Sequence, residues 1–267
     1  MKTIFTNEQL QYMRDNYDKK TYREIAKELG FTEKQVRTKI NTMGLTKRRK
    51  FNDGYFNNIN SPNQAYWLGF IYADGYIVDN PKLATYELGM ELHINDRYIL
   101  EELNKDLGSQ HIVQNKHGYK EFNGYNYETD SSVIRIYSKR IVKDLERYNI
   151  VPNKTNCSEF PKCNNLYFFD FLRGFCDGDG CIYVNKNNIR VQFINSNREF
   201  LEYLSQEIEQ RINIHGHIYK EKEKKYRLIY FKSNDVLTLL DNMYHNKNNH
   251  FLKRKYEKFK SYYGFTA

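Results

Sequence analysis

Apolar and polar positions follow two different periods along this chain, and two of its apolar runs are nearly alike. The first run covers residues 67–75 and the second residues 172–180. Each has the length and continuity of a buried helix, and each ends in Asp-Gly before an aromatic-rich extended stretch. We therefore predict two similar helices, each with a carboxylate at its C-terminal tip.

The elements that follow the two runs come in the same order. After the first run the pattern predicts strands at 76–78 and 86–94, a helix at 96–107, a strand at 133–137 and a helix at 138–148. After the second run it predicts strands at 182–184 and 189–194, a helix at 197–212, a strand at 226–231 and a helix at 234–244. A common order over so many elements indicates an internal duplication.

The first 46 residues have a separate pattern, that of three short helices. Thr6 and Thr32 have the positions of N-caps, while Gly30 would end the second helix. Ala26 is small enough for two helices to cross closely. This spacing resembles a helix-turn-helix, and the resemblance implies that the exposed face of the third helix enters the major groove of DNA with Lys34, Gln35, Arg37, Thr38 and Asn41. A three-helix bundle that binds only protein is the alternative.

Positive charge is concentrated in the same region. The chain has a net charge of +9, and residues 1–50 hold 13 Lys and Arg against 6 Asp and Glu, a net of +7. Four consecutive cations, Lys47, Arg48, Arg49 and Lys50, open an Asn- and Gly-rich stretch that ends at residue 60. We predict a linker that follows the phosphate backbone of DNA, although a merely solubilising tether has the same composition.

Several classes of protein do not fit the sequence. Apolar runs are shorter than the roughly 18 residues of a membrane span, and the N-terminus lacks a signal peptide. We expect a protein that is cytoplasmic, in a bacterial or phage-infected cell, and not secreted. The cysteines, Cys157, Cys163, Cys176 and Cys181, lack the close pairing of most zinc sites. No histidine has the position of a base that activates a nucleophile.

At residues 61–262 the chain resembles the LAGLIDADG homing endonucleases, in the single-chain form with two motifs. The resemblance is carried by the two apolar runs and by the shared order of elements after them. It implies an α+β fold, a pseudo-twofold duplicated αββαββα saddle, with the all-α helix-turn-helix domain in front. The expected domains are 1–46, a basic linker at 47–60, and the repeats at 61–163 and 164–267. Tyr72 departs from the motif, at a position where the family has an Asp that is not the essential carboxylate.

The small residues of the two motifs explain how their acids could meet. Gly69 and Ala73 lie on one stripe of the first helix, and two glycines have the same spacing in the second. Helices that cross through such stripes would bring Asp74 and Asp179 side by side. Two carboxylates with phosphate oxygens and water suit Mg²⁺, and we expect two or three divalent ions, with Mn²⁺ as a possible substitute. The alternative is that both Asp-Gly pairs are only helix-ending turns.

The resemblance also implies a basic residue near each scissile phosphate. The matching positions are Lys154 and Lys255, with Arg254 as a competitor for the second, and ordinary surface lysines are the alternative. Strand alternation turns Leu88, Met90 and Leu92 inward, as it does Ile189, Val191 and Phe193. It leaves Glu91, Arg190 and Gln192 to face DNA, and it suggests that Glu91 and Gln192 occupy matching places near the metal site.

These features together favour a site-specific double-strand DNA homing endonuclease. It would be intron-encoded or free-standing, act as a monomer without a protein partner, and make a staggered cut at a long, non-palindromic site. An intron RNA maturase or a non-cleaving DNA-binding regulator could use the same fold. Retention of both Asp74 and Asp179 favours the nuclease.

Overall fold

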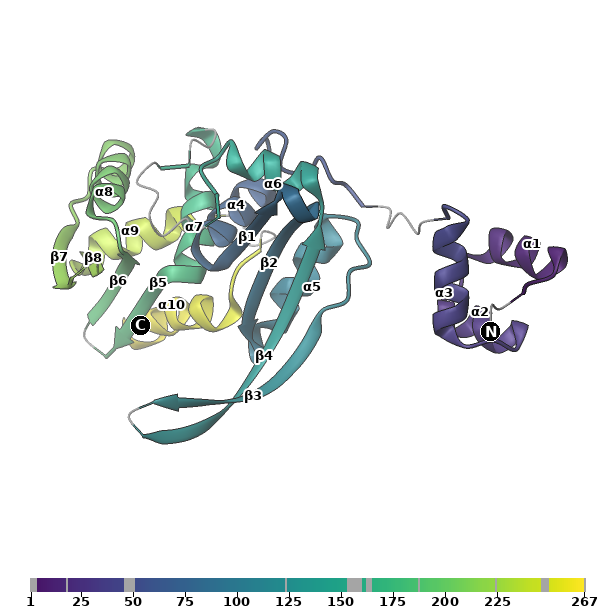
Figure 1. Ribbon diagram of the computed structural model, residues 1–267. Coiled ribbons are helices and arrows are strands. Elements are labelled where there is room, and N and C mark those ends of the chain that lie inside the picture. Colours follow the sequence, from purple (N-terminus) through teal and green to yellow (C-terminus); the bar gives the residue numbers. More distant parts are fainter. Residues whose placement is uncertain are drawn as a thin grey trace. The chain divides into compact units, whose positions relative to one another are not determined.

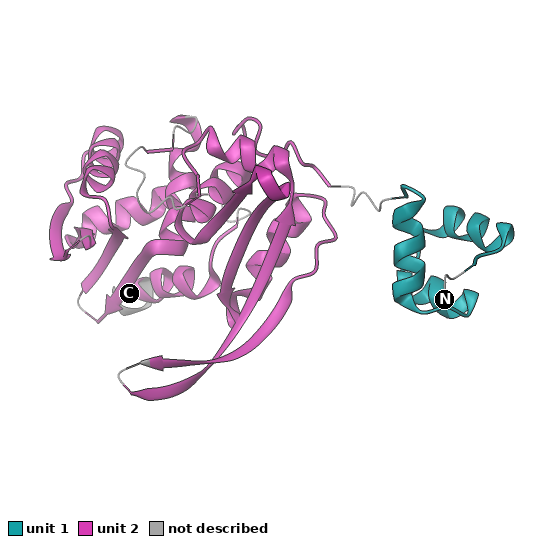
Figure 2. Ribbon diagram, viewed as in Figure 1, with its two compact units in different colours: residues 1–50 teal, residues 51–267 magenta. Residues whose placement is uncertain are grey.

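The structure is a computed structural model (Figure 1), and it describes residues 4–17, 19–45, 51–122, 124–152, 160–161, 165–186, 188–223, 225–245 and 250–266. The chain forms two compact units, Met1–Lys50 and Phe51–Ala267 (Figure 2). No helix within the described ranges combines the length and the apolar character needed to cross a membrane.

The first unit contains the three predicted helices, α1 (Asn7–Asn16), α2 (Tyr22–Leu29) and α3 (Glu33–Thr42). Each begins with a threonine that closes a capping box, which satisfies backbone amides left open at a helix N-terminus. Gly30 ends α2 in the left-handed region at φ 71°. Glycine adopts this conformation without a clash because it has no Cβ atom. A small apolar core holds the bundle together: Met13, Ile25, Ala26, Val36 and Ile40.

The second unit repeats one order of elements twice. The first repeat has α4 (Pro62–Asp74), β1 (Gly75–Asn80), β2 (Thr85–His93), α5 (Arg97–Asp106), β3 (Gln114–Phe122), β4 (Tyr125–Tyr137) and α6 (Lys139–Glu146). The second has α7 (Phe168–Asp179), β5 (Gly180–Asn185), β6 (Asn188–Asn195), α8 (Arg198–Ile212), β7 (His217–Lys222), β8 (Lys225–Tyr230) and α9 (Ser233–Met243), followed by α10 (Lys253–Thr266). The α+β fold is therefore the predicted αββαββα duplication.

Each repeat contributes one four-stranded antiparallel sheet, with the orders β1-β2-β4-β3 and β5-β6-β8-β7. The strand residues predicted to point inward, at 88, 90 and 92 on β2 and at 189, 191 and 193 on β6, are all buried. They belong to one continuous core that includes both repeats and both motif helices, α4 and α7. The opposite face of each sheet, which we call its outer face, is turned away from this core.

Three elements were missed by the sequence analysis, namely β3, β7 and α10. The edge strands β3 and β7 are mostly polar and mostly exposed, so they lack the apolar alternation that marks a half-buried strand. The predicted linker was also too long. Tyr55, Phe56 and Ile59 are buried in the core, so the segment that begins at Phe51 is part of the second unit.

Strands β3 and β4 extend beyond their sheet as a two-stranded ribbon (Figure 1). Strand β4 pairs with β2 only from Ser131 to Tyr137, so its first six residues have β3 as their one neighbouring strand among the described residues. Register divides the charges of this ribbon between its two faces. One face carries Lys116, Lys120, Tyr125 and Tyr127, and the other carries Glu121, Glu128 and Asp130.

Candidate functional site

The motif helices α4 and α7 cross with their backbones in contact. A Cβ atom added to Gly69 would lie 2.0 Å from the carbonyl oxygen of Phe171, and one added to Gly174 would lie 1.9 Å from that of Tyr66. Ordinary contacts of a Cβ atom begin near 3.4 Å, so no other residue fits at either position without moving a helix. The close crossing predicted from the small residues is confirmed.

The crossing brings the C-terminal tips of the two helices together. A Cβ atom on Gly178 would lie 2.3 Å from Cβ of Ala73 and 3.2 Å from Oδ2 of Asp74. The Asp74 carboxylate therefore lies against the last turn of α7, at Gly178, the residue that precedes Asp179. Asp74 is exposed and Asp179 is half-buried, so solvent or a ligand can reach this end of the helix pair.

Two carboxylates are a small donor set for a metal. Within the described residues no group of three or more His, Cys, Asp or Glu side chains is placed to hold an ion. Mg²⁺ is commonly bound by one or two carboxylates together with substrate phosphates and several waters. Asp74 and Asp179 fit that kind of site, in which a phosphate completes the coordination, and they do not fit a closed protein cage.

The two motifs differ two residues before their shared acids, where the first has Tyr72 and the second has Asp177. Tyr72 is buried and its ring stacks on Phe200 at 5.0 Å between centroids, so this position serves packing in the first repeat. The corresponding Asp177 is buried, and its Oδ2 accepts hydrogen bonds from the Tyr66 hydroxyl at 3.0 Å and the Leu252 amide at 2.8 Å. Burial raises the pKa of Asp177 to about 6, although the Lys255 ammonium and these hydrogen bonds oppose the rise.

Lys255 lies at the C-terminal end of α7. The residue is 5% exposed, and its ammonium donates to the carbonyl oxygens of Cys176 and Asp177 at 2.6 Å and of Gly180 at 2.7 Å. A cation there balances the partial negative charge of the helix end next to Asp179. The competing candidate, Arg254, pairs with Asp96 at 3.0 Å instead. A catalytic role for Lys255 stays a prediction, and Lys154 lies outside the described residues.

Residues 250–255, which we call the strap, connect the second motif helix to the first repeat. His250 bonds to Glu102 at 2.8 Å and to Asp106 at 2.7 Å, both on α5, and Asp106 also accepts from the Trp67 indole at 2.8 Å. Burial lowers the pKa of His250, but these two carboxylates outweigh it and raise the pKa to about 9. The imidazole is therefore protonated at neutral pH and forms a partly buried ion pair between the repeats.

The strap was not foreseen from the sequence. Further bonds of the strap run to both repeats, since the Lys253 amide donates to the Tyr98 hydroxyl at 2.7 Å and the Leu252 amide donates to Asp177. All of these partners are distant in sequence. Acidic residues on an amphipathic helix such as α5 have the same pattern as an ordinary solvated face, so no local signal marked them.

The predicted DNA-facing strand residues all lie on the outer faces. Glu91 is exposed, and its carboxylate accepts from Lys116 and Ser131 at 2.6 Å each, which lowers its pKa. Arg190 is exposed, with its guanidinium 4.5 Å from the centre of the Tyr183 ring. Gln192 is half-buried.

The idea that Glu91 and Gln192 occupy matching places is wrong. Tyr76, the residue after the first motif's last glycine, pairs with Gly89, whereas Cys181, the residue after the second motif's last glycine, pairs with Gln192. Gln192 therefore corresponds to Gly89. Alternation assigns a residue to a face of its strand, but it does not fix the register of that strand with its neighbour.

In the first unit, α3 presents Lys34, Arg37, Thr38 and Asn41 to solvent. Gln35 has a structural task, because its Oε1 accepts from the amide and the hydroxyl of Thr32 at the start of the helix. Arg37 lies 3.5 Å from Glu33 in an exposed ion pair. DNA binding by this helix stays a prediction, and residues 47–50 lie outside the described residues.

Comparison with known proteins agrees with this architecture. Residues 169–249 match the family described as LAGLIDADG-like domain. The structure is similar to the homing endonuclease I-WcaI bound to its DNA recognition sequence, with 15% identity and a TM-score of 0.54, over 82% of this chain and 96% of that chain. It is also similar to the meganuclease I-SmaMI bound to uncleavable DNA, with 15% identity and a TM-score of 0.51, over 76% of this chain and 89% of that chain. The chain therefore carries a LAGLIDADG-like domain at residues 169–249 and shares its fold with the single-chain homing endonucleases.

Proposed function

We propose that the protein is a site-specific DNA endonuclease that cuts both strands of a long, non-palindromic site, as a homing endonuclease does. The observation that carries the proposal is the contact between the helix tips, where the Asp74 carboxylate lies against α7 beside Asp179. Two acids at one accessible point between two sheets suit the hydrolysis of phosphodiester bonds. The shared fold with I-WcaI and I-SmaMI supports this assignment.

Asp74 and Asp179 would hold Mg²⁺, or Mn²⁺ in its place, together with phosphate oxygens of the substrate. The bound ions would supply an activated water and stabilise charge on the leaving oxygen. Lys255 keeps the end of α7 neutral, so that the backbone carbonyls beside Asp179 stay in place when the charges of the substrate arrive. The motif helices cannot separate or slide without a clash or a cavity, and this fixes the spacing of the two acids.

The outer faces of the two sheets are the proposed surfaces for duplex DNA. Four-stranded antiparallel sheets present rows of alternating side chains that can enter a major groove. Because the rows of the two repeats differ in sequence, one chain can read two different half-sites, and a monomer suffices. The first unit, with Lys34 and Arg37 on α3, and the cations at 47–50 would extend the contact to further phosphates.

The test is cleavage of duplex DNA. The substrate is the DNA that flanks the gene, or the intron-free form of that locus, and it is incubated with the full chain in Mg²⁺ or in Ca²⁺. We expect a discrete staggered cut in Mg²⁺, and its loss in Asp74→Asn and Asp179→Asn while binding in Ca²⁺ persists. Asp130→Asn is the matched control, since this exposed acid lies on the ribbon and pairs with His117.

Other outcomes identify the other functions of this fold. Tight and specific duplex binding without cleavage by the wild type in either metal would overturn the nuclease in favour of a DNA-binding regulator. Failure to bind any duplex, together with recovery of an intron RNA on the immobilised protein, would overturn it in favour of a maturase. Cleavage that survives in Asp74→Asn and Asp179→Asn would contradict the assigned site.

A further inference from the structure

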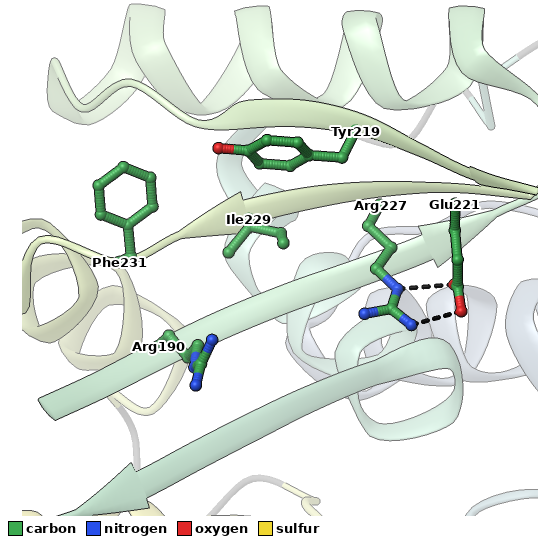
Figure 3. A pocket seen from close by; sticks show the side chains of 6 residues that line it. All are labelled: Arg190, Tyr219, Glu221, Arg227, Ile229 and Phe231. Atoms are coloured by element: carbon green, nitrogen blue, oxygen red, sulfur yellow. Dashed lines mark hydrogen bonds and ion pairs between the residues drawn. The ribbon is translucent and has the colours of Figure 1, made fainter.

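The outer face of the second sheet has an open hollow of about 400 Å³ (Figure 3). Its lining combines apolar and aromatic side chains with two arginines and one acid: Arg190, Tyr219, Glu221, Arg227, Ile229 and Phe231. These residues come from β6, β7 and β8 and from the residue after β8. Such a lining is neither a purely charged surface nor a buried core.

Strand register places the lining on one side of the sheet. Ile229 lies opposite Gln192 on β6 and opposite His217 on β7, while Arg227 lies opposite Tyr219. The alternate residues of β8, Leu228 and Tyr230, are buried in the core. The hollow is therefore on the face that is proposed to meet DNA.

Its apolar part is accessible. Tyr219 on β7 is 50% exposed and Phe231 is 44% exposed. The half-buried Ile229 lies on β8, two residues before Phe231 and two after Arg227, the partner of Tyr219. Apolar groups gathered around one depression are a feature of surfaces that bind a partner. The occupant should therefore present a small apolar group.

The polar part consists of two arginines that are held differently. Arg227 uses one edge of its guanidinium for Glu221, with Nε 2.7 Å from one carboxylate oxygen and a terminal nitrogen 2.6 Å from the other (Figure 3). Arg190 takes part in no ion pair within the described ranges, and its guanidinium lies over Tyr183. Arg190 is exposed next to the apolar floor, where an acceptor on a ligand can reach its donors.

We propose that this hollow reads a thymine with an adjacent guanine in the major groove of the target, and the inference rests on the proposed function. The thymine 5-methyl group is the apolar group that base pairs present in the major groove, and it would lie on Ile229 between Tyr219 and Phe231. Guanine presents O6 and N7 as a pair of acceptors, which fit two donors of Arg190. The Arg227–Glu221 pair forms the fixed polar wall on the other side.

Duplex DNA suits the hollow better than an unpaired base does. An unpaired base binds by stacking on a flat aromatic platform, as single-stranded RNA does on many sheets. Here the floor is the aliphatic Ile229, with the aromatic rings at its sides, and this shape suits a methyl group. The arginine beside it suits the Hoogsteen edge of a guanine that remains paired.

The experiment starts from duplexes selected out of a randomised library by the full chain in Ca²⁺. We expect an invariant thymine next to guanine in the half-site of the second repeat. Replacing that thymine by deoxyuridine removes only the methyl group, and it should weaken wild-type binding about three- to fivefold, the effect of one buried methyl. Replacing the guanine by 7-deazaguanine removes N7 and should weaken binding by about tenfold.

Variants connect these effects to the hollow. Ile229→Ala should bind thymine and uracil duplexes equally, whereas the conservative Ile229→Val should keep the preference. Arg190→Lys should lose the response to 7-deazaguanine while it retains the positive charge. Deoxyuridine at a thymine of the other half-site is the control, and its effect should be the same in wild type and Ile229→Ala.

A selected site without thymine at this place, or a wild type indifferent to the methyl group, would overturn the inference and leave the endonuclease proposal intact. A methyl preference that persists in Ile229→Ala would also overturn it. Failure of the wild type to bind duplexes at all, with binding of single-stranded RNA that is weakened by Tyr219→Ala, would overturn both proposals.

Discussion

Substitution of Gly174 by alanine tests the contact on which the site depends. The added Cβ would lie 1.9 Å from the carbonyl oxygen of Tyr66 and 2.9 Å from the amide nitrogen of Phe70. Both atoms belong to the backbone of α4, so no side chain can turn aside to make room. The two motif helices would have to move apart.

The size of the effect follows from this geometry. To reach an ordinary contact of 3.4 Å the helices must separate by about 1.5 Å at the crossing, which also loosens the packed side chains along both of them. Overpacking of a core costs about 1–3 kcal/mol, and a clash between backbones belongs at the upper end, about 3 kcal/mol. For a unit of this size that corresponds to a decrease in Tm of about 6–12 °C.

Thermal unfolding followed by circular dichroism measures this decrease. The matched control is Gly118→Ala on the ribbon, where the added Cβ would meet only Thr129 Oγ1 at an ordinary 3.6 Å. Its Tm should stay within about 2 °C of the wild type, because surface substitutions change stability by about 0.5 kcal/mol or less. If Gly174→Ala also melts within that range, the helices do not cross as closely as described and the reasoning fails.

Three further predictions concern the tip, the strap and the ribbon. Gly178→Ala pushes its Cβ against Ala73 and Asp74, so cleavage should fall at least tenfold with DNA binding kept, and unchanged cleavage would count against the paired acids. The raised pKa of His250 gives stability that is full below pH 6.5 and is lost as the pH rises through about 9. The difference in Tm between wild type and His250→Gln should therefore shrink as the pH is raised from 6 to 10. A Tm difference that stays constant over this range would contradict the ion pair. For duplex DNA binding measured at several salt concentrations, Lys120→Gln should reduce the slope of the logarithm of the binding constant against the logarithm of the salt concentration by about 0.9, the effect of one phosphate contact. Glu128→Gln, on the other face of the ribbon, should leave this slope unchanged.

The parts of the fold that were predicted correctly are those with a local signal. The motif helices combine a long apolar run, paired small residues and an Asp-Gly stop, so their positions, their crossing and the duplicated order could be predicted from the sequence. Strands with one buried face, such as β2 and β6, show the alternation that gives their inward residues. The capping boxes of the first unit were equally readable, because they need only residues three positions apart.

What could not be predicted depends on contacts between distant segments. The polar strands β3 and β7 become strands through pairing with β4 and β8, and their own sequences resemble loops. His250 meets Glu102 and Asp106 through the tertiary fold, with nothing nearby in sequence to announce it. The error over Gln192 has the same origin, since only the neighbouring strand fixes its register.

The strap also bears on the stage of synthesis at which the proposed site is complete. Asp74 is made early, but α4 lacks its crossing partner until α7 follows, and the carbonyl oxygens at the end of α7 lack the Lys255 ammonium until the strap is made. A ribosome must therefore translate past the strap before the end of α7 has all of these contacts. For an enzyme of the proposed kind, an interrupted chain that stops before the strap should bind DNA without damaging it.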